Sequence, residues 1–171
     1  MDSTLVTKIL AKIGYVLLNV QSTERVIKRV IQIAMPRERE FFVSLSERLA
    51  SKDTDRPLGA FLTELRKRAE VHSDVNVLLK RFLLRRNTFI HEISKPEGWT
   101  LKTKEGLRVI NGQLDELLAD SAEVRTLFLA LIYAWKVQGE MHTTKEEDEA
   151  FQAISGKYEG GVLSRKWGSD A

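Results

Sequence analysis

Long segments with an apolar residue at every third or fourth position restrict the fold of this chain more than any other feature. Such a period places an apolar stripe along one side of an α-helix. Only three prolines and ten glycines interrupt the 171 residues, which disfavours a loop-rich or all-β architecture. The pattern predicts an all-α fold, an up-and-down helical bundle of four to six helices with short connections.

The period and its interruptions give approximate bounds for each element. The predicted helices cover about residues 4–34, 37–49, 58–70, 73–93 and 104–139. Pro36 ends the first, since proline donates no helix hydrogen bond, and residues 51–57 are a loop by composition. The polar residues at 21–24 predict a bend in the first helix, and those at 119–122 predict a break in the last. Either Ser73 or Asp74 is expected to cap the fourth helix, and Thr103 the fifth. Residues 99–101 are expected to be extended.

The chain is expected to change character near residue 143. Residues 1–142 are predicted to form the bundle, and residues 143–171 a C-terminal short helix and flexible tail. The acidic run that begins at Lys145 suits a short solvated helix, and the Gly- and Ser-containing segment after it is typical of a mobile end.

Composition excludes several classes of protein. The absence of cysteine excludes a disulfide scaffold, a cysteine nucleophile and a thiolate metal site. The longest purely apolar run, Leu127–Trp135, has nine residues, whereas a membrane span needs about 20. Lys8 and Lys12 interrupt the apolar N-terminus, and no small-residue cleavage site follows. We therefore expect a cytoplasmic protein with no membrane span, and its net charge of +3 does not by itself indicate nucleic-acid binding.

Arg86 occupies an unexpected position in the predicted fourth helix. On a wheel of about 100° per residue, the apolar side chains centre on one line, and Arg86 falls near its middle. Burial of an uncompensated charge costs several kcal/mol. Either Arg86 pairs with a buried carboxylate, or its face lines a polar cleft or subunit junction that a phosphate can enter.

His91 and Asn87 add chemistry to the same helix. Asn87 precedes His91 by four positions, so the two share a face and Asn87 could hydrogen-bond the imidazole ring. A histidine can accept a proton near neutral pH, and an arginine holds phosphate with a bidentate fork. Together they suit RNA cleavage by attack of the ribose 2′-hydroxyl on its own phosphate, which needs no metal.

The segment Arg86-Asn87-Thr88-Phe89-Ile90-His91 resembles the Arg-polar-x-x-x-His signature of the HEPN superfamily. HEPN domains are helical bundles of about this size, and the motif lies on a late helix that one more long helix follows. The order of the predicted elements agrees over roughly residues 1–140.

The resemblance implies a metal-independent endoribonuclease without a cofactor, of the kind found in toxin–antitoxin and antiviral systems. His91 would be the general base or acid, Arg86 would hold the scissile phosphate, and Asn87 would position His91 or the substrate. A homodimer is implied, with both motifs at a shared cleft, as is an antitoxin or regulatory protein as a possible partner. Nucleotidylation of a tyrosine two positions after the histidine is excluded, because Ile93 stands there. Some HEPN domains are catalytically silent modules for dimerisation and for binding a partner or nucleotide, which is the alternative.

Basic residues surround the motif. Lys80, Arg81 and Arg85 are the predicted substrate-binding residues, and with Arg86 and Lys95 they face Glu92 alone in that stretch of sequence. Local positive potential attracts phosphates even when the net charge is small. Further clusters occur at Arg25–Arg29 and Arg66–Arg68, which can equally be solvated helix faces. His72 and His142 have no second ligand at helical spacing, so no metal site is expected.

Overall fold

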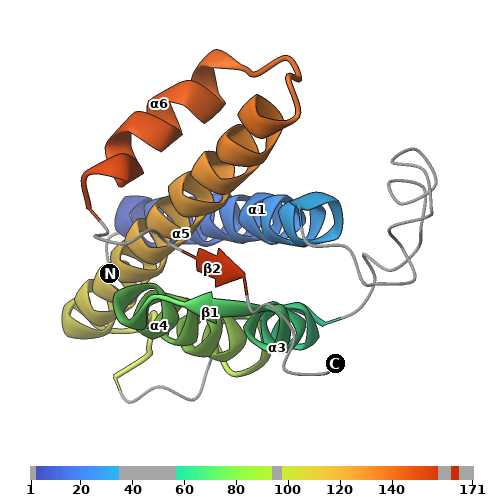
Figure 1. Ribbon diagram of the computed structural model, residues 1–171. Helices are drawn as coiled ribbons and strands as arrows, with labels where there is room; N and C mark the ends of the chain where they lie inside the picture. Colours follow the sequence, from blue (N-terminus) through green and yellow to red (C-terminus); the bar gives the residue numbers. More distant parts are fainter. Residues whose placement is uncertain (1–2, 35–56, 94–97, 158–162, 166–171) are drawn as a thin grey trace.

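The computed structural model describes residues 3–34, 57–93, 98–157 and 163–165 (Figure 1). The described elements are α1 (Ser3–Ala34), α3 (Leu58–Arg68), β1 (Ala69–Val71), α4 (Ser73–His91), α5 (Lys104–Gln138), α6 (Lys145–Ser155) and β2 (Leu163–Arg165). The predicted helical character is confirmed, with one small β-ribbon in addition. The helix predicted at 37–49 lies outside the described residues, so the total number of helices stays a prediction.

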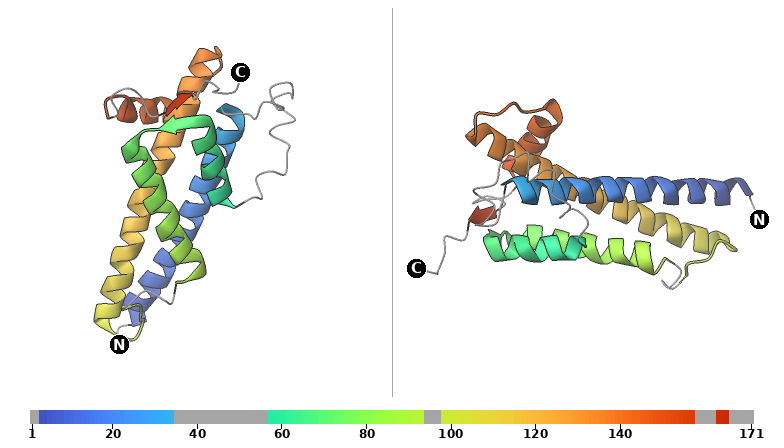
Figure 2. Two further views of the ribbon diagram at one scale, coloured as in Figure 1. Left: turned by 60° about the horizontal axis from the view of Figure 1, so that its bottom comes forward. Right: turned by 90° about the vertical axis from the view of Figure 1, so that its right-hand side faces the viewer.

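Three long helices, α1, α4 and α5, form the body of the bundle. Contacts from Lys12 to Asp115 (2.6 Å) and from Thr23 to Ser121 (2.9 Å) show that α1 runs parallel to α5. Figure 2 shows α4 running back along both, so that the start of α1 and the α4–α5 connection lie at one end. The side chains packed between them include Val16, Val20, Phe82, Leu114 and Phe128, all at most 1% exposed.

A polar layer crosses the middle of this core. Thr23 of α1 and Ser121 of α5 are fully buried and hydrogen-bond each other, and Arg125 donates to Ser22 at 3.0 Å. Both helices continue without interruption through these residues. The predicted bend at 21–24 and the predicted break at 119–122 are therefore wrong, because these polar residues join two helices and do not end either one.

The helix ends show which side chains cap them. The Thr103 hydroxyl accepts from the Gly106 N–H, as predicted. Thr144 and Glu147 form a reciprocal capping box at the start of α6. The cap of α4 is neither Ser73 nor Asp74, because its N-cap is His72, whose Nδ1 accepts from the Asp74 N–H.

The short strands join two distant parts of the chain. β1 follows α3 directly and pairs antiparallel with β2, Ala69 opposite Arg165 and Val71 opposite Leu163. The third predicted helix thus ends two residues early, and Leu163–Arg165, within the predicted C-terminal tail, form the second strand. Residues 99–101 form no strand.

Helix α6 is packed on the end of α5 rather than being wholly solvated. Glu147 and Ala150 are buried, and the Phe151 ring stacks on Tyr133 at 4.8 Å between centroids. Lys136 of α5 pairs with Glu147 at 2.7 Å. The acidic run that begins at Lys145 therefore has one face in contact with the bundle.

By length and composition, one helix in the described part of the chain could cross a membrane. It is Ser3–Ile33 of α1, with a mean hydropathy of 1.3 in its most apolar window and 17% of that window buried. Core helices and signal sequences pass the same test, and α1 contributes Val16 and Val20 to the core. Leu10 and Leu18 are exposed on its other side. The absence of a membrane span and the cytoplasmic location stay predictions.

Candidate functional site

The C-terminal half of α4 carries Arg86, and α1 supplies its partner. Arg86 Nε lies 2.5 Å from Glu24 Oε1, and the two side chains are only 19% and 13% exposed. The burial of an arginine near the middle of the apolar face is thus explained by the first of the two predicted reasons, a largely buried carboxylate. The face that carries Arg86 packs on α1, so its position alone does not require a subunit junction.

The other end of the Arg86 guanidinium reaches the remaining motif residues. Nη1 donates to Asn87 Oδ1 at 3.0 Å and lies 3.4 Å from His91 Nε2. A guanidinium N–H can only donate, so a hydrogen bond between these two atoms requires Nε2 as its acceptor. Asn87 was expected to orient His91, but here its oxygen contacts Arg86, which connects all three side chains.

These side chains line an open cleft of about 440 Å³ between the start of α3 and α4. Pro57, Leu58 and Gly59 form one wall, and Asn87 and His91 lie on the other. Pro57, the N-cap of α3, offers no side-chain hydrogen bond to the helix. The first N–H groups of a helix carry partial positive charge, so the α3 wall of the cleft favours an anion. On the α4 wall Arg86 does the same, although Glu92 also lines that wall.

Arg85 and Arg81 lie on the opposite side of α4, facing α5. Arg85 donates to Asp120 and Glu116, each at 2.6 Å, and Arg81 donates to Asp120 at 2.8 Å. Asp120 is 2% exposed. The hydrogen bond to Asp120 raises the pKa of the Arg81 guanidinium. Neither arginine lines the cleft that contains His91.

The remaining predicted basic residues are also accounted for. Lys80 is exposed and makes no hydrogen bond or ion pair to any residue that the structure describes, and Lys95 lies outside those residues. Lys28 lies over the Phe61 ring, and Arg66 donates to Asn76 at 3.0 Å. The sequence of α4 alone has an excess of basic residues. In the fold, acidic residues of α5 neutralise Arg81 and Arg85.

Glu24 is the site residue that the sequence did not reveal. It is separated from Arg86 by 62 positions and lies in a segment that resembled a helix bend. The only sequence signal for it was the need of Arg86 for a carboxylate. Within the described ranges no group of three or more His, Asp or Glu side chains could hold a metal, and a metal-independent site stays a prediction.

No protein-family model matches this chain, and searches of curated proteins and of solved structures also find no match. The resemblance to the HEPN superfamily therefore depends on Arg86–His91 and on the helical frame that holds them.

Proposed function

We propose that the protein is a metal-independent endoribonuclease of HEPN type, with its site in the α3–α4 cleft. The observation that carries the proposal is the Arg86 guanidinium, which is anchored by Glu24 and touches Asn87 and His91 at the edge of an open cleft. One helix thereby presents a fixed cation and a proton acceptor within one hydrogen-bonding distance of each other.

The chemistry follows from these groups. When RNA binds, its phosphate replaces His91 as a partner of Arg86 Nη1, which frees His91 Nε2. Nε2 then accepts the proton of a ribose 2′-hydroxyl, and the resulting oxygen attacks the adjacent phosphorus. The bond from phosphorus to the 5′-oxygen breaks, which leaves a 2′,3′-cyclic phosphate and a 5′-hydroxyl. Arg86 stabilises the charge that develops on the phosphoryl oxygens, and Asn87 holds Arg86 in place. No metal or cofactor takes part.

The departing 5′-oxygen must receive a proton, which one chain or a homodimer could supply. His91 is the one histidine that lines the described cleft. It can return its proton to the 5′-oxygen, or the His91 of a second copy can supply one at a shared site. Leu84 and Val77, on the exposed side of α4, are 68% and 58% exposed in the single chain, so a partner could cover them. A monomeric mass at micromolar concentration would contradict the dimer.

The same proposal places the protein in the cytoplasm, as the toxic or effector part of a defence system with an antitoxin or regulatory protein as partner. One observation favours the alternative, a catalytically silent module for dimerisation or for partner or nucleotide binding. The Glu24–Arg86 pair alone gives Arg86 a structural role, because a paired arginine needs no substrate.

Cleavage of RNA in the presence of a chelator separates the two functions. Purified wild type is compared with His91→Ala and Arg86→Ala, and with His142→Ala, which replaces an exposed histidine outside the cleft. We expect wild type and His142→Ala to produce 2′,3′-cyclic phosphate ends. The His91 variant should be slower by about 10²–10⁴-fold, the usual contribution of general acid–base catalysis. Intact RNA with wild type, or full activity in His91→Ala, would overturn the nuclease.

A further inference from the structure

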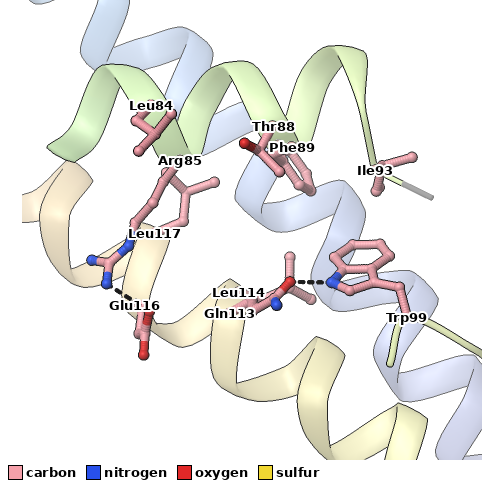
Figure 3. A pocket seen from close by; sticks show the side chains of 10 residues that line it. All are labelled: Leu84, Arg85, Thr88, Phe89, Ile93, Trp99, Gln113, Leu114, Glu116 and Leu117. Carbon is pink, nitrogen blue, oxygen red and sulfur yellow. Dashed lines mark hydrogen bonds and ion pairs between the residues drawn. The ribbon is translucent and has the colours of Figure 1, made fainter. Parts of the chain in front are cut away.

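A second cavity lies on the other side of α4, between α4 and α5 (Figure 3). Its volume is about 250 Å³, slightly below the roughly 300–1,000 Å³ of pockets that take whole small molecules. This size suits one planar ring system better than a complete nucleotide.

The lining of this pocket combines an apolar interior with a polar rim. Phe89, Leu114 and Leu117 form its buried wall, and Trp99 lies at one end. Gln113 and Glu116 lie on the α5 side. Aromatic faces with a few polar groups at the edge are how proteins hold an unstacked RNA base.

Trp99 is held in position by its surroundings. Its indole N–H donates to Gln113 Oε1. The chain turns at Gly98, whose φ of 82° suits glycine. The backbone then passes so close to α5 that a Cβ on Gly106 would lie 2.2 Å from the Thr100 oxygen. A ring fixed in this way loses little freedom when a ligand stacks on it.

Gln113 and Glu116 retain unused hydrogen-bonding capacity. With Gln113 Oε1 occupied by Trp99, the amide nitrogen remains a donor and bonds to none of the residues that the structure describes. Glu116 Oε2 accepts from Arg85, which leaves Oε1 as an acceptor. The rim therefore offers one donor and one acceptor to a ring.

The pocket adjoins the cleft of the proposed nuclease. Leu84 and Thr88 line both cavities, so the wall between them is one ridge of α4. We infer that the pocket is the base-binding subsite of the RNA substrate, with Trp99 stacking on a base near the scissile phosphate and Gln113 and Glu116 bonding to the edge of that base. This inference rests on the proposed endoribonuclease function.

The rim predicts which bases fit. Gln113 Nε2 donates and Glu116 Oε1 accepts, so the rim needs a base edge that carries an acceptor beside an N–H donor. Each base has such an edge: O6 and N1–H of guanine, O4 and N3–H of uracil, N3 and the amino group of cytosine, and N1 and the amino group of adenine. The subsite should therefore accept all four bases, whereas a rim with two acceptors would favour guanine, whose N1–H and amino group are two adjacent donors.

Mapping of cleavage sites on an RNA that contains all sixteen dinucleotide steps tests the inference. The key variant is Gln113→Glu, which keeps the oxygen that accepts from Trp99 and replaces the donor with an acceptor. Gln138→Glu makes the same change at an exposed position at the other end of α5. We expect wild type and Gln138→Glu to share one base profile, and Gln113→Glu to shift cleavage about tenfold towards steps with guanine in the recognised place, because two acceptors at the rim match the two adjacent N–H donors of guanine. Trp99→Leu should cleave more slowly at every base, and Trp99→Phe should be nearer wild type.

Binding of nucleotides gives a readout that does not need cleavage. The four nucleoside 5′-monophosphates are titrated into the His91→Ala protein, and the indole N–H resonance of Trp99 is followed by NMR, assigned by its loss in Trp99→Phe. Saturable shifts with these nucleotides, and tighter binding of GMP relative to AMP once Gln113→Glu is added, support the subsite even if no RNA is cleaved, which would overturn the nuclease alone.

Other results would overturn the inference. If RNA is cleaved and Gln113→Glu and Gln138→Glu have the same base preference, the pocket does not select the base while the nuclease stands. If RNA is not cleaved and the Trp99 resonance does not respond to any nucleotide, both proposals fail. If only apolar additives shift the Trp99 resonance, the pocket binds an apolar side chain of a partner protein and not a base.

Discussion

Arg85 and Arg86 are neighbours on one helix, and the bundle uses them in opposite ways. Arg85 faces α5, where Asp120 and Glu116 engage both of its terminal nitrogens. Arg86 faces α1 and the cleft, where Glu24 takes its Nε and its Nη1 contacts Asn87 and His91. One position along a helix turns a side chain by about 100°, which is enough to place the two in different environments.

The difference shows what decides whether an arginine can serve a ligand. Asp120 is 2% exposed and receives two guanidinium groups, so the Arg85 side of α4 is a closed ionic cluster. On the Arg86 side one carboxylate, Glu24, pairs with the guanidinium, and Glu92 lines the same open cleft. Part of the guanidinium remains accessible to an anion. The number of basic residues on a helix does not reveal this distinction, because the acidic residues come from other helices.

The largest effect is expected at the closed cluster. Asp120→Asn removes the negative charge that pairs with both Arg81 and Arg85. It should lower the free energy of unfolding by about 3 kcal/mol, which is the lower end of the cost of breaking a buried ion pair. The lower end applies because both arginines are partly exposed to water. Urea denaturation measures it. Asp115→Asn, whose side chain is 57% exposed and pairs with Lys12, should cost at most about 1 kcal/mol. Equal effects in the two variants would show that Asp120 is not a buried ionic centre.

The open side should respond in activity rather than in stability. Arg86→Lys keeps the positive charge but loses the planar guanidinium that connects Glu24 to Asn87 and His91. We expect RNA cleavage to be about 10²-fold slower, which is the usual cost of removing one hydrogen-bond donor to the transition state. Arg81→Lys, at the arginine of the Asp120 cluster that lines neither cavity, should act mainly on the unfolding free energy. Single-turnover cleavage and urea denaturation of both variants measure the two quantities. If Arg81→Lys slows cleavage as much as Arg86→Lys, the assignment of separate roles is wrong.

A smaller effect on the free energy of unfolding is expected in the polar layer that joins α1 to α5. Thr23→Val leaves the buried Ser121 hydroxyl without its partner and should lower the unfolding free energy by about 1–3 kcal/mol. Thr126→Val is the matched control, because the Thr126 hydroxyl bonds only within its own exposed turn. A neutral Thr23→Val would show that Glu24, one residue later, is positioned without this contact.

The smallest effect concerns the pH dependence of α6. Burial raises the pKa of Glu147, but hydrogen bonds from Lys136 and Thr144 outweigh it, so the folded-state pKa is below its usual value. This carboxylate therefore stabilises the fold above the unfolded-state pKa of about 4.3, and the contribution is lost as the pH falls through the folded-state value. Between pH 6 and pH 3 the free energy of unfolding of wild type should fall by up to about 1 kcal/mol through Glu147, and Glu147→Gln should lack this contribution. Thermal unfolding at a series of pH values measures it. An identical pH profile in both proteins would contradict the assignment.

Much of the fold could be predicted from local patterns. The long helices follow from apolar periodicity, and Thr103 follows from the preference of helix starts for threonine. The errors arose where a polar residue inside a helix contacts another helix. Thr23 and Ser121 resembled helix breaks separately, and only their contact explains both.

The candidate site was predictable on α4 and not beyond it. Arg86, Asn87 and His91 lie within one stretch of six residues, whereas Glu24 and the α3 wall of the cleft come from distant segments. The three-residue strands are too short to show an alternating pattern, and their pairing joins residues more than ninety positions apart. Such contacts depend on the whole fold and leave no local signal.

The pairing of β1 with β2 also has a consequence for the order in which the chain is completed. β2 is the last described element to be synthesised, and closure of so long a loop is entropically unfavourable until the helices have formed. The ribbon can form only after the residues of the core and of the Arg86 cleft have been synthesised. Until then both edges of β1, next to the turn into α4, lack a partner strand among the described elements, and such edges are open to pairing with other chains. Pairing with β2 covers one of these edges and joins two segments that are far apart in the chain.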